Sequence, residues 1–82
     1  MDKKNKHLVK LGQQIRQARK AKDLSQEALA LLADIDRSYM GGIERGERNV
    51  SFLTLVKLAT YLDCSVSTFT MNIPDPEEHK TE

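Results

Sequence analysis

The sequence has few of the side chains from which catalytic and metal sites are built. It contains one cysteine, Cys64, and two histidines, His7 and His79, near opposite ends of the 82-residue chain. A single cysteine excludes an internal disulfide, and a metal centre or a nucleophile–base pair needs several such side chains close together. We therefore expect no enzyme activity, no catalytic or metal-binding residues, no cofactor and no small-molecule ligand.

Long apolar runs are also absent. No run approaches the roughly 20 residues needed to cross a bilayer, and no signal-peptide core follows the lysine-rich segment 1–7. With 39% hydrophobic and 30% charged residues, the composition is that of a soluble globular chain. The length allows one domain with a modest core. We expect a cytoplasmic protein with no membrane partner.

No segment alternates apolar and polar residues as a half-buried strand would, whereas apolar residues recur at steps of three and four. This pattern predicts an all-α fold, a compact five-helix bundle. The expected helices run over about 7–21, 26–33, 37–45, 52–62 and 66–72. Inward positions expected in the second and fourth helices include Leu29, Leu32, Ala33, Phe52, Leu55, Leu58, Ala59 and Leu62. Predicted N-caps are Ser25, Asp36 and Ser51, and the predicted C-cap is Gly46.

Composition separates a C-terminal tail from the rest of the chain, and charge separates a basic first part from an acidic second part. From Pro74 onward it holds two prolines and mostly charged residues, too little apolar surface to order itself. We expect one domain over 1–73 and a disordered tail over 74–82. Residues 1–50 carry eleven Lys or Arg against seven Asp or Glu, whereas residues 51–82 carry two against five. The first part therefore suits a polyanion.

Residues 26–43 have the organisation of a helix-turn-helix. A short helix carries the small Ala30, a turn follows at 34–36, and a second helix buries Met40 and Ile43, three residues apart. Such a second helix enters the major groove of DNA, and its N-terminal residues meet base edges. The pattern turns the following residues outward: Arg37, Ser38, Gly41, Gly42 and Arg45. Arg37 suits a bidentate contact with guanine.

Two pairs of segments carry a resemblance to known families. Residues 24–30, LSQEALA, and 43–46, IERG, resemble the signature of the Cro and lambdoid-phage-repressor helix-turn-helix superfamily. Residues 36–39, DRSY, and 42–49, GIERGERN, more narrowly resemble the controller proteins of restriction–modification systems, which are small homodimers. The resemblance covers about residues 8–72 and implies a lambda-repressor-like DNA-binding domain.

The resemblance implies roles for individual residues. Gln26 should touch a phosphate, and Arg19 should pair with Glu44. The residues expected to contact DNA are Arg16, Gln26, Arg37, Ser38, Tyr39, Gly42, Arg45, Arg48 and Asn49. Two positions depart from the family, which usually has glycine where Asp34 stands and often a base-reading side chain where Gly42 stands.

Several alternatives stay open from the sequence. The basic face of the first helix, which includes Arg16, either binds DNA or is solvated. The pair Gly41 and Gly42 either lets the backbone approach DNA or makes a weak helix. The apolar residues of the last helix complete the monomer core or form a dimer seam, and we expect the seam to contain Val66, Phe69 and Ile73.

The function predicted from these residues is sequence-specific, double-stranded DNA binding by a homodimeric transcription regulator. We expect a controller protein that binds palindromic operators, with RNA polymerase as a candidate partner. The alternatives are another small phage-type repressor, or a helical protein-interaction or antitoxin module with the same fold, because fold alone does not decide function.

Overall fold

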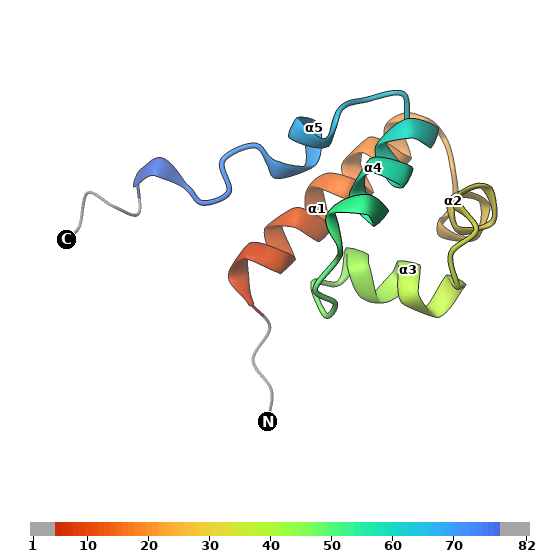
Figure 1. Cartoon of the computed structure of the whole chain (residues 1–82), viewed down its shortest axis with the longest axis horizontal. Helices are drawn as coiled ribbons and strands as arrows, with labels where there is room; N and C mark the ends of the chain where they lie inside the picture. Colours follow the sequence, from red (N-terminus) through yellow and green to blue (C-terminus); the bar gives the residue numbers. More distant parts are fainter. Residues whose placement is uncertain (1–4, 78–82) are drawn as a thin grey trace.

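A computed structural model describes residues 5–77 (Figure 1). Within that range the regular secondary structure is helical, and turns and loops join the helices. Its helices are α1 (Lys6–Ala21), α2 (Gln26–Ala33), α3 (Arg37–Glu44), α4 (Phe52–Tyr61) and α5 (Val66–Thr70). The predicted all-α fold with five helices is therefore confirmed. The last helix is shorter than the sequence suggested, because it ends at Thr70 instead of about residue 72.

Side-chain caps explain where the central helices begin. The hydroxyl oxygen of Ser25 accepts a hydrogen bond from the Ala28 amide at 3.0 Å, and Asp36 Oδ2 accepts one from Tyr39 at 3.1 Å. Ser51 caps α4 in the same way through the Thr54 amide, at 3.1 Å. Each cap satisfies one of the amides that a first helical turn leaves without a partner. The three predicted N-caps are confirmed.

The turn after α2 depends on an aspartate in the left-handed conformation. Asp34 has φ +56° and ψ +50°, and its amide hydrogen-bonds to carbonyl oxygens of the last turn of α2. Aspartate is one of the few residues besides glycine that visit this region without severe strain. Asp34 therefore makes the tight turn into α3 at the position where the sequence lacks the family's usual glycine.

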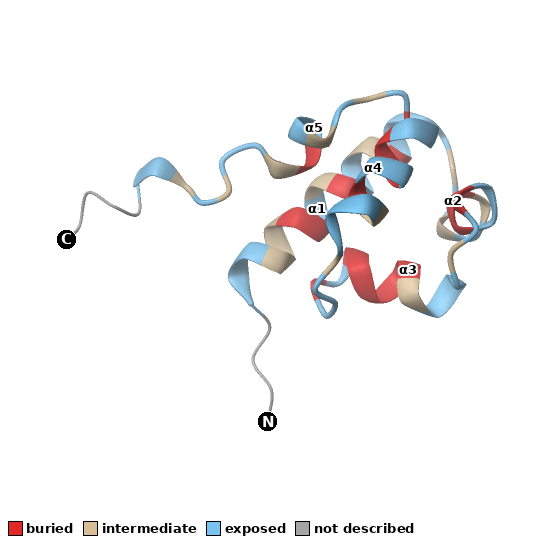
Figure 2. Ribbon diagram, in the orientation of Figure 1, coloured by how far each residue is buried: buried red, intermediate tan, exposed pale blue. Residues whose placement is uncertain are grey.

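One apolar core joins the helices. Its fully buried large side chains are Ile15, Leu29, Met40, Ile43, Leu58 and Phe69. Figure 2 shows buried residues in each of the five helices, including the whole second half of α3. The prediction that Met40 and Ile43 face inward is confirmed. The same prediction was wrong for Leu32, which is 48% exposed, and Phe52, an apolar position of the fourth helix, is 65% exposed. Each lies at an end of its helix, where the pattern of spacing continues although no neighbouring element covers the residue.

The short helix α5 packs against α1. Gln14 Nε2 donates a hydrogen bond to the Phe69 carbonyl oxygen, and Lys10 Nζ donates one to the Asn72 carbonyl at 2.9 Å. The Phe69 side chain has no exposed surface. The expectation that Phe69 lies in a dimer seam is therefore wrong: α1 covers the helix that the sequence left uncovered. Val66 and Ile73 are half-buried and pack against the same core.

Beyond α5, the structure describes the chain only as far as Glu77. The segment 74–77 includes a turn in which Asp75 Oδ1 accepts a hydrogen bond from the Glu77 amide at 3.0 Å. The rest of the predicted disordered tail, 78–82, lies outside the described residues. No described helix is long and apolar enough to span a membrane. The described residues also contain no cluster of three or more His, Cys, Asp or Glu suited to a metal ion.

Candidate nucleic-acid interface

Helices α2 and α3 form the helix-turn-helix. The Ile35 amide donates to the Ala30 carbonyl at 2.8 Å and closes the turn between the two helices. Ala30 and Met40 are buried between the helices, and this orientation turns the first residues of α3 outward. Arg37 and Ser38 are both exposed. The structure therefore presents the N-terminal turn of α3 to solvent, as a groove-binding helix requires.

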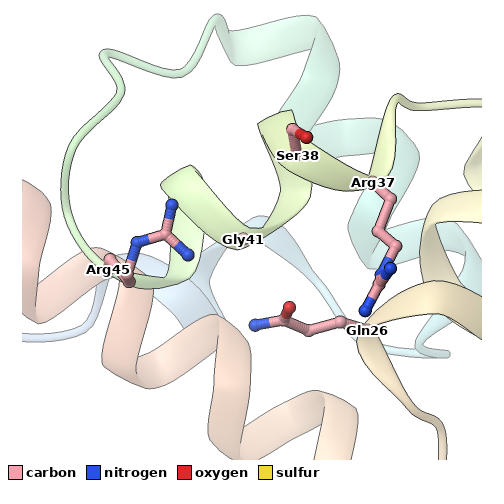
Figure 3. Close-up of a pocket in the computed structure, with 5 residues that line it drawn as sticks. All are labelled: Gln26, Arg37, Ser38, Gly41 and Arg45. Atoms are coloured by element: carbon pink, nitrogen blue, oxygen red, sulfur yellow. The ribbon is translucent and has the colours of Figure 1, made fainter.

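A small open pocket, with a volume of about 230 Å³, lies between α2 and α3. Figure 3 shows Arg37 and Arg45 from opposite ends of α3, with Gln26 of α2 reaching toward Gly41 between them. The five described lining residues are Gln26, Arg37, Ser38, Gly41 and Arg45, and none of them is acidic. The guanidinium groups of Arg37 and Arg45 can only donate hydrogen bonds, and the Ser38 hydroxyl and the Gln26 amide are uncharged. The pocket is suited to an anion or to the acceptor edge of a base.

An ion pair beneath this pocket ties α1 to α3. Arg19 Nε lies 2.6 Å from Glu44 Oε2, and Arg19 Nη2 lies 3.0 Å from Glu44 Oε1. Both residues are buried, with 7% of each exposed. Arg19 Nη1 also donates to the Leu24 carbonyl at 2.6 Å, so the guanidinium also holds the segment before α2. Arg19 and Glu44 thus pair as the resemblance implied.

Gln26 connects the ion pair to the pocket. Its Nε2 donates to Glu44 Oε1 at 3.0 Å, while its Oε1 lies beside Gly41, 3.4 Å from where a Cβ on that glycine would stand. The side chain therefore lies across the pocket between α2 and α3 instead of extending freely into solvent. Its contact with a DNA phosphate stays a prediction.

Arginine side chains lie close to both glycines of α3. A Cβ at Gly41 would lie 2.9 Å from Arg45 Nη1, and a Cβ at Gly42 would lie 3.0 Å from Arg48 Cγ. Both glycines are buried. They lie on the outward side of α3, but arginine side chains from the end of α3 and the following segment lie over them, so neither is bare backbone. DNA contact at Gly42 stays a prediction.

The remaining candidates lie around α3 at different distances from the pocket. Tyr39 is half-buried, and the guanidinium carbon of Arg48 lies 5.8 Å from the centroid of its ring. Arg16 on α1 and Asn49 after α3 are exposed, and both lie outside the pocket lining. The structure thus places Gln26, Arg37, Ser38 and Arg45 together, whereas Tyr39 and Arg48 form a second group.

Sequence reasoning missed an ion pair at the edge of the pocket, between Arg45 and Glu47. Arg45 Nε lies 3.1 Å from Glu47 Oε1, and both side chains are substantially exposed. This ion pair holds the Arg45 guanidinium on one side while Gly41 leaves room for it on the other. The spacing of two residues across a helix end gives no periodic signal, since side chains two apart on a helix do not face each other.

Comparison with known proteins agrees with this geometry. The family model described as "Helix-turn-helix" matches residues 15–69. The chain is 42% identical over 60 residues to control protein C.MunI of Mycoplasma sp, covering 72% of this chain and 81% of the relative. It is 45% identical over 56 residues to control protein C.SmaI of Serratia marcescens, covering 68% of this chain and 67% of the relative.

Solved structures give the same result. The restriction–modification controller protein C.AhdI from Aeromonas hydrophila is 54% identical, with a TM-score of 0.77, over 79% of this chain and 98% of that protein. The biofilm master regulator SinR, solved in complex with DNA, is 42% identical, with a TM-score of 0.69, over 72% of this chain and 95% of that one. The region matched by the family comparison contains α2, α3 and every residue that lines the pocket.

Proposed function

This chain belongs to the helix-turn-helix family and is a DNA-binding transcription regulator, and from that premise we propose that it controls a restriction–modification system. In this proposal a homodimer binds a palindromic operator, with one α3 in each half-site. The proposal follows the control proteins C.MunI and C.AhdI, to which the chain is similar over 72% and 79% of its length. RNA polymerase is the second partner, because so small a regulator acts by excluding the polymerase or by contacting it. The site of action is the cytoplasm, where the operator lies.

The observation that carries the proposal is the exposed start of α3 beside the pocket. Arg37 and Ser38 stand free at the first turn of a helix whose opposite side, Met40 and Ile43, is fixed in the core. A planar guanidinium in this position can donate to both O6 and N7 of a guanine. Gln26 and Arg45 flank it, and they are placed for contacts that fix the register of the helix on the duplex.

The homodimer in this proposal uses a surface other than the seam that the sequence indicated. Phe69 is enclosed by its own monomer, and Val66 and Ile73 are half-buried. Helix α4 instead exposes Phe52, Leu53 and Val56, three apolar side chains within one stripe of the helix.

We call Phe52, Leu53 and Val56 the α4 apolar face. Their exposed fractions are 65%, 75% and 38%. Large exposed apolar patches mark interaction sites, and these three side chains are exposed within two turns of one helix. A second copy of the chain offers the same face and can cover it by two-fold symmetry, as in most homodimers. A pair so formed would present two α3 helices to half-sites about 34 Å apart, one helical turn of DNA.

The test is a selection of binding sites from random double-stranded DNA. The wild-type chain is incubated with a library of random duplexes, and bound fragments are recovered, amplified and sequenced through several rounds. We expect an enriched palindrome whose half-site centres lie about one turn, or 10–10.5 base pairs, apart. Binding of the selected duplex should weaken steeply with salt, since phosphate contacts release counterions. Recovery of fragments with no common sequence would contradict the proposed function.

A further inference from the structure

The outward surface of α3 has no side chains of its own at two consecutive positions, 41 and 42. Gly41 and Gly42 occupy the middle of the helix, and Gly42 follows Tyr39 by three residues and Ser38 by four. Residues at these spacings share one face of a helix. The face that begins with Ser38 and Tyr39 at the N-terminal turn therefore continues over a position that has no side chain of its own.

A side chain from outside the helix fills this gap. A Cβ built on Gly42 would lie 3.0 Å from Arg48 Cγ, 3.3 Å from Arg48 Nε and 3.7 Å from Arg48 Cδ. Gly42 is buried while Arg48 is exposed. The atoms that cover the glycine are thus those of an arginine whose surface remains open to solvent.

Two contacts hold Arg48 over α3. Its guanidinium carbon lies 5.8 Å from the centroid of the Tyr39 ring, within the range in which a cation is attracted to an aromatic face. The Glu47 amide donates to the Gly42 carbonyl at 2.9 Å, which keeps the residue just before Arg48 against the end of the helix. Arg48 is thereby fixed at both ends, through its backbone neighbour and through its guanidinium group.

From this arrangement we infer that Arg48 supplies the base-reading side chain that α3 lacks at position 42, and that Gly42 is the positioning residue that makes room for it. The ligand group is the major-groove edge of a guanine, whose two acceptors match the planar guanidinium fork. The inference rests on the proposed function, because it assigns one further contact within the same DNA interface.

The inference predicts a specific dependence between the two positions. A valine at position 42 would occupy the space of the Arg48 stem and force that side chain away from Tyr39. The loss of DNA affinity in Gly42→Val should then come from the displaced Arg48 side chain and not from contacts of the new methyl groups with DNA. Valine is a better helix former than glycine, so Gly42→Val should melt at the same temperature as the wild type or higher. Gly42→Ala should give a weaker effect in the same direction, since its single methyl group requires a smaller shift.

The experiment is a double-mutant cycle on the duplex that the wild type selects. Affinities are measured for the wild type, Gly42→Val, Arg48→Ala and the double variant, on the selected duplex and on its single-base-pair substitutions. We expect each single variant to lose at least about fivefold in affinity, the loss of one good base contact. Both should also lose preference at the same base pair of each half-site. Adding Gly42→Val to Arg48→Ala should change the affinity by less than about twofold, because contacting residues are not additive.

Arg48→Lys is the matched control, because it keeps the charge and removes the planar fork. It should bind unrelated duplexes as the wild type does and lose the preference at that base pair. Equal losses from Gly42→Val with and without Arg48 would overturn the inference, because the new side chain would then meet the DNA directly. Equal weakening of all duplexes by Arg48→Ala would overturn it as well. If the wild type selects no sequence, the proposed function fails; if it selects one and the cycle is additive, only this inference fails.

Discussion

Arg19 in the last turn of α1 and Lys22 at its C-cap each form an ion pair, the first buried and the second exposed. The Arg19–Glu44 pair has side-chain exposures of 9% and 2%, whereas the Lys22–Asp63 pair, at 3.0 Å, has exposures of 41% and 80%. Removing one partner of a buried pair leaves an uncompensated charge and costs about 3–5 kcal/mol. An exposed pair contributes at most about 1 kcal/mol, because water screens it and two long side chains must be ordered.

We therefore predict that Arg19→Ala lowers the free energy of unfolding by about 3–5 kcal/mol, and that Lys22→Ala changes it by less than about 1 kcal/mol. Urea denaturation of both variants measures the difference, and Lys22→Ala is the control for loss of a cation from the same end of α1. In Arg19→Ala, Glu44 keeps only the hydrogen bond from Gln26. A variant with wild-type stability and weaker binding to all DNA would instead make Arg19 a phosphate contact.

Arg37 and Gln26 line one pocket, but we expect Arg37 to contact a base and Gln26 to contact a phosphate. Arg37 is exposed with its guanidinium free to approach a base, while Gln26 is held to Glu44 at 3.0 Å. We predict that Arg37→Ala costs roughly 1–3 kcal/mol on the operator and removes the preference at one base pair per half-site. Gln26→Ala should weaken operator and random DNA by similar factors, with little change in the salt dependence, because glutamine carries no charge.

Titration of both variants on the selected duplex and its single-base variants measures this difference. If Arg37→Ala weakens every duplex equally and keeps the base preference, Arg37 is a phosphate contact. The readout would then come from Ser38, Tyr39 or the shape of the DNA.

At the scale of helices, a glycine sets the distance between α1 and α3. A Cβ on Gly12 would lie 2.4 Å from the Ile43 carbonyl oxygen and 2.6 Å from that of Glu44. These are backbone atoms at the C-terminal end of α3, and they cannot rotate out of the way. The close approach also brings Arg19 of α1 within reach of Glu44.

We predict that Gly12→Ala destabilises the protein by about 1–3 kcal/mol, the usual cost of an overpacked core, although alanine is the better helix former. Gln13→Ala, at an exposed neighbouring position of α1, is the control and should be neutral within about 0.5 kcal/mol. Thermal or urea unfolding of the two variants compares them. A Gly12→Ala variant as stable as the control would show that α1 can shift without strain.

The elements were predictable from the sequence because their signals are local. Ser25, Asp36 and Ser51 cap helices by bonds within three residues, and α2 begins and ends where the pattern predicted. Contacts between distant segments were not predictable. Nothing in the sequence marks Gly12 as the contact point of two helices, or Gly42 as the residue over which the Arg48 side chain lies. The burial of Phe69 was missed for the same reason, since its cover is α1, more than 50 residues away.

The same limit applied to the candidate site. Periodicity placed Arg37 and Ser38 outward because Met40 and Ile43 had to face inward, and the fold agrees. Periodicity describes directions around one helix and says nothing of a side chain that arrives from a loop. The resemblance had already implied that Arg45 and Arg48 contact DNA, but only the structure shows that their side chains lie over Gly41 and Gly42.

For the whole molecule, stability and dimerisation should depend on different aromatic and aliphatic residues. Phe69 of α5 is fully buried in the core, while Leu53 on the α4 apolar face is 75% exposed. Truncation of a buried phenylalanine to alanine typically costs 3–5 kcal/mol, a large part of the ~5–15 kcal/mol that stabilises a small domain. A charge at an exposed leucine costs the monomer little, but it places two like charges together if that face is a two-fold interface.

We predict that Leu53→Asp is a monomer with near-wild-type melting temperature, whereas Phe69→Ala melts at a markedly lower temperature. Sedimentation equilibrium measures the first and thermal unfolding the second. Leu31→Asp is the matched control, since Leu31 is 82% exposed on α2 and outside the proposed seam, so it should remain a dimer. Leu53→Asp should bind a single half-site as the wild type does but lose the added affinity of the full palindrome, because that gain comes from joining two α3 helices. A Leu53→Asp protein that stays dimeric would show that the partner covers another face.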